Sequence, residues 1–243
     1  MTDNMARLED LDQFYILLLK LEKILNGKRR LNNCTGKMNW PKKGVYFFFE
    51  PQEMRADGIT SRVVRVGTHA LKVKSKSTVW NRLRQHRGNL KGSMSGGGNH
   101  RGSVFRLHVG TAIIQRQHLV KEYSSWGVGS SANKDVREKE YPIEKLVSEY
   151  IGKKPFLWLS ILDEAGPNSM RGYIERNSIA LLSNYGKINT DEAIDPPSKD
   201  WLGFDAVSEK IRASGLWNSN HVSEDYSPEF LIRLEDYIDG LGE

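Results

Sequence analysis

The stretch GVYFFFE, residues Gly44 to Glu50, constrains the fold of this chain more than any other feature of its sequence. Four consecutive aromatic side chains follow Pro41 and Gly44, and Pro51 closes the run. A run of this kind between turn residues predicts a central β-strand. Taken alone, Tyr46 in this strand would be one more buried aromatic of the core. Only residues further along the chain indicate that its hydroxyl has a chemical role.

The order of the other elements predicts an α/β (α+β) fold. Residues 4–26 place apolar side chains at helical spacing, and Gly27 ends this helix. The strand at 44–49, a polar turn and the run RVVRV ending at Gly67 predict a β-hairpin. We expect a small central sheet, mixed or antiparallel, flanked by helices. The other expected elements are a helix through VWNRLRQH capped by Ser77 or Thr78, a helix at about 134–151, a buried strand at 156–162, a helix capped by Asn168 or Ser169, and a helical tail from Pro228. The type of residues 103–120 stays open.

Composition shifts along the chain predict three parts. Residues 1–40 form a helical N-terminal extension, and residues 41–187 form the core. Six glycines between Gly88 and Gly102 predict a flexible basic loop inserted in this core near 88–102. Residues 188–243 are predicted to be a partly helical, acidic C-terminal extension. The loop lacks the GKS or GKT ending of a P-loop, so we expect no nucleoside triphosphate site.

The single cysteine and the absence of a long apolar run bound the class of protein. With only Cys34, the chain has no internal disulfide framework and no multi-cysteine zinc site. The charged N-terminus is unlike a signal peptide, and no apolar run approaches the roughly 18 residues of a membrane span. We expect a soluble, cytoplasmic protein without membrane contact. The apolar stripe of residues 4–26 predicts a packing or pairing face, so a homodimer is compatible with the sequence.

The charge of the chain is distributed very unevenly. From Gly58 to Lys121, a stretch of 64 residues contains 13 lysines and arginines and no aspartate or glutamate. The remaining residues carry 23 basic and 30 acidic side chains. A solvated surface normally mixes both signs, so a stretch of one sign favours a polyanionic partner, most often nucleic acid. Five of the six histidines also lie in this stretch, but none has a set of partners typical of a zinc site.

Four short motifs occur in an order that resembles the GIY-YIG nuclease superfamily. Gly44-Val45-Tyr46 is similar to the family's GIY, and Arg65-Val66-Gly67 is similar to its YIG. The run from Arg82 to His86 resembles its RLxxH helix, and Glu175 in YIERNSIALL resembles its metal-binding glutamate. The resemblance covers residues 41 to about 184. It implies a metal-dependent endonuclease that hydrolyses DNA phosphodiester bonds.

The resemblance also implies roles for the individual residues. Tyr46 would be the general base or would position the attacking water, and Arg82 would stabilise the charge of the transition state, since its planar fork of donors suits phosphate oxygens. His86 lies one helical turn after Arg82 and shares its face. Glu175 would hold one hard divalent cation, Mg²⁺ or another such as Mn²⁺, with waters completing its shell.

The sequence departs from the family pattern at its second tyrosine, where it has Arg65. An arginine there can contact the scissile phosphate but cannot relay a proton at pH 7. The family also uses an asparagine after the glutamate, for which both Asn184 and Asn218 are candidates. Residues expected to contact DNA phosphates are Arg84, Arg87, Lys91, Arg101, Lys72 and Lys74.

Each candidate also has a purely structural interpretation. Arg82 can be an ordinary surface residue, His86 can interact with the C-terminus of its helix, and Glu175 can lie on a solvent face. The function we expect is a DNA endonuclease, most simply a stand-alone restriction or host-defence enzyme acting on double-stranded DNA. The alternative is a nucleic-acid-binding module that has kept the fold and lost cleavage, which the missing second tyrosine supports.

Overall fold

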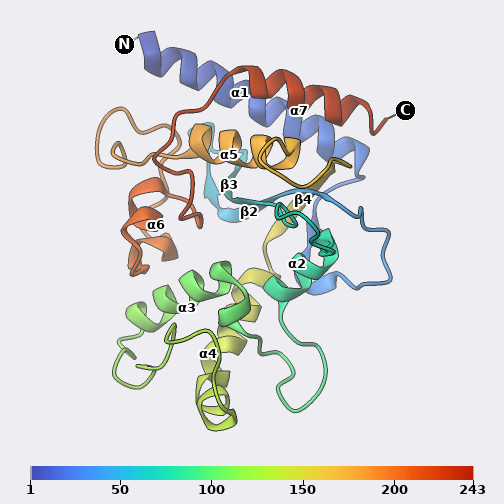
Figure 1. The fold of residues 1–243 in the computed structure, drawn as a ribbon. Helices are drawn as coiled ribbons and strands as arrows, with labels where there is room; N and C mark the ends of the chain where they lie inside the picture. Colours follow the sequence, from blue (N-terminus) through green and yellow to red (C-terminus); the bar gives the residue numbers. More distant parts are fainter. Residues whose placement is uncertain (1, 243) are drawn as a thin grey trace.

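The computed structural model describes residues 2–242, which form one antiparallel sheet with helices on both of its faces (Figure 1). The strands are β1 (Arg29–Arg30), β2 (Gly44–Met54), β3 (Ser61–Gly67) and β4 (Pro155–Ser160). The helices are α1 (Thr2–Ile24), α2 (Val79–Arg87), α3 (Val104–Arg116), α4 (Lys134–Gly152), α5 (Met170–Leu182), α6 (Glu209–Ser214) and α7 (Glu229–Asp239). The strand order is β1-β4-β2-β3, so the aromatic strand β2 lies inside the sheet as expected.

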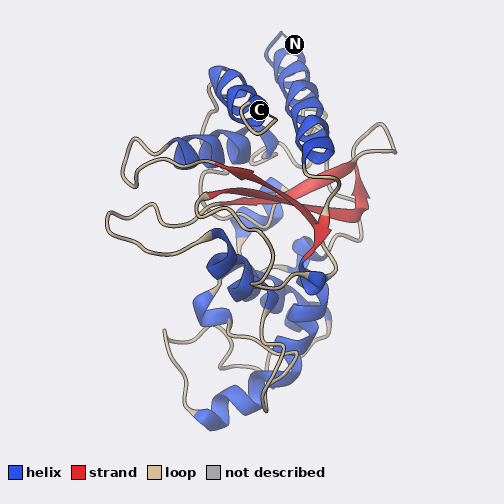
Figure 2. Cartoon of the chain, turned by 90° about the vertical axis from the view of Figure 1, so that its right-hand side faces the viewer, coloured by secondary structure: helices blue, strands red, loops and turns tan. Residues whose placement is uncertain are grey.

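Alternating side chains of β2 serve the two faces of the sheet. Val45, Phe47 and Phe49 point to the face that α1, α5 and α7 cover. Tyr46 and Phe48 point to the opposite face, which α2, α3 and α4 cover. Figure 2 shows the sheet edge-on between these two layers of helices. The aromatic run is therefore completely buried because both of its faces have a covering layer.

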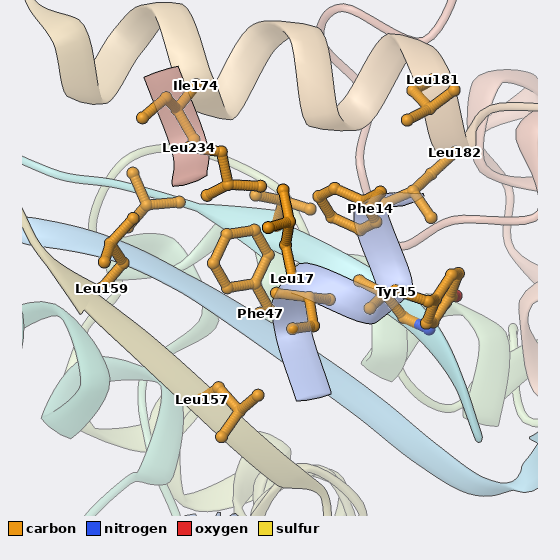
Figure 3. Close-up of a cluster of buried hydrophobic side chains, with 14 of the residues drawn as sticks. Phe14, Tyr15, Leu17, Phe47, Leu157, Leu159, Ile174, Leu181, Leu182 and Leu234 are labelled. Carbon is orange, nitrogen blue, oxygen red and sulfur yellow. The ribbon is translucent and has the colours of Figure 1, made fainter. Parts of the chain in front are cut away.

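The layer of α1, α5 and α7 is held to the sheet by large apolar side chains. Phe14 of α1 meets the ring of Phe47 edge-on at 5.9 Å, and Leu234 of α7 packs into the same cluster (Figure 3). Each fully buried side chain of this size contributes about 1.5–3 kcal/mol. The two terminal helices thus share one hydrophobic core with the sheet. On its outer side α1 still exposes Met5 and Ile16, so the expectation of a homodimer stays a prediction.

The structure extends β2 past the end that the sequence predicted. The strand was expected to finish at Phe49, but it runs on to Met54 through Pro51. Pro51 is tolerated because the pairing with β3 is irregular between Phe49 and Met54, where a missing N–H removes no regular ladder bond. A second irregularity lies in β3, where Phe48 pairs with Arg65 and Phe49 pairs with Val63. The regular pairs before this bulge, Tyr46 with Gly67 and Phe48 with Arg65, place Arg65 on the side of the sheet on which Tyr46 lies.

The segment that the sequence left open, residues 103–120, begins with a helix. Ser103 is the N-cap of α3, and its side chain accepts a hydrogen bond from the backbone N–H of Arg106. Thr78 caps α2 and Ser169 caps α5 in the same way, each one of the two residues expected for that cap. The glycine-rich loop folds back on itself through backbone bonds between Asn89 and residues 96 and 97.

Candidate active site

The hairpin of β2 and β3 brings the GVY and RVG motifs together. Tyr46 is paired with Gly67, and the phenol of Tyr46 lies directly over this glycine. A Cβ at position 67 would lie 2.5 Å from the Tyr46 hydroxyl and 2.6 Å from its ring, closer than real contacts allow. Only glycine therefore leaves room for the tyrosine side chain. The ring is 1% exposed, so both strands fix its position.

The imidazole of His86 holds the Tyr46 hydroxyl from the other side. His86 Nε2 lies 2.9 Å from the Tyr46 hydroxyl, and His86 Nδ1 lies 2.8 Å from the hydroxyl of Ser103. Ser103 Oγ already accepts the N–H of Arg106, and a hydroxyl can accept a second hydrogen bond. An Nδ1–H of His86 can therefore donate to Ser103, which leaves the Nε2 lone pair facing Tyr46. The chain Tyr46–His86–Ser103 can hold or move a proton.

Burial keeps the imidazole of His86 neutral. The side chain is fully buried, and this burial together with the charges of Arg82, Arg65 and Arg106 lowers the pKa of His86 well below 6.5. A cationic imidazole would have to be desolvated close to three guanidinium groups. At neutral pH His86 is consequently a hydrogen-bond acceptor or base.

Two guanidinium groups stand close to this tyrosine. Arg82 of α2 donates to the side chain of Gln85 at 3.0 Å and to the carbonyl of Gly102 at 3.1 Å. Arg65 is 7% exposed, lies 4.8 Å above the ring of Phe105 and donates to the carbonyl of Trp217. Burial lowers the pKa of Arg65, yet an arginine stays charged in proteins. The charge of Arg65 is thus held beside the site without a carboxylate partner in contact.

Glu175 of α5 presents a carboxylate to the same region. Its Oε1 accepts the backbone N–H of Thr68 at 3.0 Å, and its Oε2 has no hydrogen-bond partner among residues 2–242. Burial raises the pKa of Glu175, while the Thr68 bond and the charges of Arg65, His221 and Arg82 act in the opposite direction. The partly buried carboxylate is therefore only partly compensated by protein groups.

The donor set around Glu175 fits one hydrated hard cation. No group of three or more His, Cys, Asp or Glu side chains in the described part of the chain could hold a metal ion by itself. A cation here would have the one carboxylate and several waters as ligands, a coordination that Mg²⁺ accepts. Oε2 could bind such a cation while Oε1 keeps its hydrogen bond from the N–H of Thr68.

One pocket of about 220 Å³ collects these side chains. The candidates Tyr46, Arg65, Arg82 and Glu175 all line it, although they come from β2, β3, α2 and α5. His86 does not line the pocket and lies behind Tyr46. The volume is enough for a phosphate group and a few waters. A hydroxyl, two cations and a carboxylate around such a space suit the hydrolysis of a phosphate ester.

Of the two candidate asparagines, the structure brings only Asn218 to the pocket. Asn184 is fully buried elsewhere, where its amide bonds the backbone of Ile194 twice and accepts from Arg7. The assignment of Asn184 to the catalytic set is therefore corrected. Asn218 lines the pocket, and its amide pairs with both the N–H and the C=O of Val66 at 3.1 and 2.8 Å. It continues the ladder of the edge strand β3 and fixes the chain that follows.

A larger basic hollow lies beside the pocket. We call it the basic groove; its volume is about 980 Å³. Its charged lining residues are Lys37, Arg84, Arg87 and Lys91, and among residues 2–242 no aspartate or glutamate lines it. Gly102 and Gln85 line the groove and accept hydrogen bonds from Arg82, which lines the pocket of about 220 Å³. The groove and the pocket are thus joined at α2.

The remaining residues expected to bind phosphates have different surroundings. Arg101 donates to both carboxylate oxygens of Glu140 at 2.6 and 2.9 Å, and its side chain is 5% exposed. The expectation for Arg101 is therefore corrected: it is a structural ion pair, since α4 brings an acid from outside the acid-free stretch. Lys72 and Lys74 lie exposed on the loop between β3 and α2 and stay predictions.

Several residues at the site have no signal in the sequence. Ser103 caps a helix whose sequence pattern does not distinguish it from a strand. Thr68 acts through its backbone N–H, which carries no sequence signal. Ser219, Asn220 and His221 line the pocket from a segment more than 40 residues after Glu175. Only the tertiary structure brings that segment to the site.

The family model described as GIY-YIG domain matches residues 5–242. The match spans nearly all of the sequence, so the chain belongs to the GIY-YIG domain family. This family consists of endonucleases that generally use divalent metal ions, and the chain is accordingly a nuclease at the level of this superfamily. A nucleic acid is the corresponding substrate.

The other comparisons add no relative. Neither the search of curated proteins nor the search of solved structures found a significant match. Among residues 2–242, no helix has the length and apolar character that crossing a membrane requires.

Proposed function

We propose that this protein is a metal-dependent endonuclease that hydrolyses phosphodiester bonds of double-stranded DNA. The observation that carries the proposal is the convergence of Tyr46, Arg65, Arg82 and Glu175 on one pocket, with His86 bonded to the tyrosine hydroxyl. Hydrolysis requires a deprotonated water, stabilisation of charge on the phosphorane and assistance to the leaving oxygen. The residues of the pocket supply the first two requirements directly.

The tyrosine and histidine act together on the attacking water. Neutral His86 accepts the phenolic proton at Nε2, which frees the Tyr46 oxygen to take a proton from a water in the pocket. The hydrogen bond from His86 Nδ1 to Ser103 keeps the imidazole in the tautomer that this transfer needs. The absence of a Cβ at Gly67 leaves the room that the phenol needs in this position.

The two arginines stabilise the negative charge that develops on the phosphoryl oxygens. Arg82 presents a planar fork of donors, and its contacts to Gln85 and Gly102 orient that fork. Arg65 adds a second buried charge where the family has a tyrosine. Glu175 would hold the divalent cation, which would neutralise further charge on the phosphoryl group when bound.

The basic groove is the proposed path of the DNA backbone next to the scissile phosphate. Charge complementarity supports this path, since Lys37, Arg84, Arg87 and Lys91 line it without any acid. Its connection to the pocket through Arg82 would align a backbone held in the groove with the catalytic residues. Lys72 and Lys74 are proposed as further contacts on the exposed loop after β3.

A plasmid-nicking assay tests the proposed activity. Supercoiled plasmid incubated with the protein and Mg²⁺ should be converted to nicked and linear forms, and EDTA should abolish the conversion. Mn²⁺ should replace Mg²⁺. A protein that binds the plasmid and leaves it intact with either metal would instead support the non-cleaving alternative, for which the replacement of the family tyrosine by Arg65 is the specific observation.

We further propose a restriction or host-defence role in the cytoplasm. The support is that the family match takes up residues 5–242, so that the pocket and the basic groove lie within one matched unit. Sequencing the ends of the cleaved plasmid tests this role. Ends at fixed sequence positions would support a restriction enzyme, whereas ends scattered over the plasmid would contradict it.

A further inference from the structure

The segment Ser219–His221 forms an arch over the catalytic pocket. Before the arch, the N–H of Trp217 bonds the carbonyl of Val64 at 2.7 Å, and the Asn218 side chain is paired with β3. After the arch, Val222 is 2% exposed in the core between sheet and helices. The chain is thus fixed at both ends, and the three polar residues between them line the pocket. None of the three contributes to the hydrophobic core.

His221 is held in an unusual conformation and is oriented by a carboxylate. Its φ of 62° lies in the left-handed region, which is unfavourable for a residue with a Cβ. Its Nδ1 is 2.7 Å from an oxygen of Glu224, so the Nδ1–H donates to the carboxylate. Its Nε2 has no hydrogen-bond partner among residues 2–242. Because Glu224 occupies Nδ1, Nε2 is the nitrogen of His221 that is available to a group in the pocket.

The proposed hydrolysis still needs a group for the leaving oxygen. Tyr46 and His86 accept the proton of the attacking water. Arg82 and Arg65 stabilise the negative charge on the phosphoryl oxygens. None of them is available to protonate the oxygen that departs from phosphorus. Apart from these, His221 is the one imidazole that lines the pocket.

We propose that His221 is the catalytic residue that protonates the leaving oxygen, with Glu224 as its positioning residue; this rests on the proposed nuclease function. The water oxygen forms a bond to phosphorus, and its proton passes to the Tyr46 oxygen. The bond between phosphorus and the leaving oxygen breaks, and the proton on His221 Nε2 moves to that oxygen to give an alcohol. Solvent then returns a proton to His221, and the proton that passed from Tyr46 to His86 goes to solvent, so that no net charge accumulates.

The test uses two duplex oligonucleotides and the full chain with Mg²⁺. The products of the native protein first show which bridging oxygen leaves. The second duplex then carries sulfur in place of that oxygen, because a thiolate departs without protonation: thiols have a pKa of about 8.5, far below that of alcohols. Single-turnover rates of His221→Asn are compared with the native protein on both duplexes. Asparagine tolerates the left-handed region and cannot transfer a proton.

We expect His221→Asn to be at least about 100-fold slower than the native protein on the oxygen duplex, the lower end for losing a general acid. On the sulfur duplex the two rates should agree within a few-fold. Glu224→Gln should show the same pattern with a smaller loss. His118→Asn is the matched control, since His118 is an exposed left-handed histidine outside the pocket, and it should cleave both duplexes normally.

Two outcomes would overturn the proposal. An unchanged rate of His221→Asn on the oxygen duplex would show that the histidine transfers no proton. An equal loss on both duplexes would show a structural role or a ligand role, and a titration with Mn²⁺ would separate these by whether affinity for the metal falls. Failure of the nuclease function itself would look different, since the native protein would then cleave neither duplex.

Discussion

Protein groups satisfy the hydrogen-bonding capacity of the Glu175 carboxylate only in part. Burial raises the pKa of this side chain, and the N–H of Thr68 together with the nearby arginines only opposes that effect. Its second oxygen has no partner among the described residues. A divalent cation next to this oxygen would favour the ionised form strongly. The surroundings of Glu175 thus match a metal ligand better than a solvent-face glutamate.

Replacing Glu175 with glutamine should separate cleavage from binding. Glutamine keeps the size of the side chain and the acceptor for Thr68, but it loses the charge that a hard cation requires. We expect thermal unfolding and DNA affinity to change little, and the single-turnover cleavage rate in Mg²⁺ to fall by at least about 100-fold. Glu149→Gln, at an exposed position on α4, is the control. Native cleavage by Glu175→Gln would show that the metal binds elsewhere.

Single motif residues could be predicted from the sequence where short-range patterns fix their place. Tyr46 and Gly67 meet because a hairpin connects their strands, and His86 follows Arg82 by one helical turn. The places of Asn184 and Arg101 could not be predicted, because their partners, Ile194 and Glu140, depend on tertiary packing that no local pattern reports.

Helix α2 joins the two functional regions of the protein. Arg82 and His86, four residues apart, point toward the pocket and toward Tyr46. Arg84 and Arg87 lie on another side of the helix and line the basic groove. A helix turns about 100° per residue, so one short element can carry both sets of side chains. The proposed catalytic residues and the proposed DNA contacts on α2 therefore lie on one helix capped by Thr78.

Charge reversal in the basic groove should weaken DNA binding without a change in catalytic chemistry. We expect the affinity of native protein for duplex DNA to fall steeply with salt, because phosphate contacts release counterions. Arg84→Glu should weaken binding on all sequences and should make the salt dependence shallower. Arg137→Glu on the exposed side of α4 serves as the control. Fluorescence anisotropy over a salt series measures both effects. A flat salt response in the native protein would contradict the proposed groove.

The packing of the two terminal helices could not be predicted from the sequence. The sequence predicts both helices, but as parts of terminal extensions. The division into residues 1–40, 41–187 and 188–243 stays a prediction. In the structure, α1 and α7 pack side by side on one face of the sheet (Figure 1). The apolar pattern of each helix predicts a buried face, but it does not predict which surface covers that face. The arch over the pocket depends on this packing, because Val222 is inserted in the same core.

Three histidines, of which His69 and His86 are buried and His108 is partly buried, should make the stability of the whole chain depend on pH. Burial lowers the pKa of His69 and of His108 to about 4, and lowers that of His86 well below 6.5. The unfolded chain takes up protons at these groups near pH 6.5, whereas the folded chain does not. The free energy of unfolding should therefore fall as pH drops below about 6.5, by up to about 1.4 kcal/mol per pH unit for each histidine. The contributions of His69 and His108 should end near pH 4.

Urea unfolding between pH 7.5 and 5.0 measures this dependence. His108→Gln should flatten the slope, because a residue that cannot be protonated removes its share of the linkage. The exposed His118 offers a control, and His118→Asn should leave the slope as it is in the native chain. A free energy of unfolding that is constant from pH 6.5 to 5.0 would show that these imidazoles are protonated in the folded state.

The substitution Tyr46→Phe tests the central claim most directly, since it removes one oxygen from a ring that fills the same place. If the hydroxyl handles the proton of the attacking water, stability and DNA affinity should stay close to native. The single-turnover cleavage rate should fall by roughly two to four orders of magnitude. Arg82→Ala should lose a comparable factor, and the double variant should lose less than the product, because both residues act on one transition state. If Tyr46→Phe cleaves DNA at the native rate and loses only about 0.5–1.5 kcal/mol of stability, Tyr46 is a core residue and the account is contradicted.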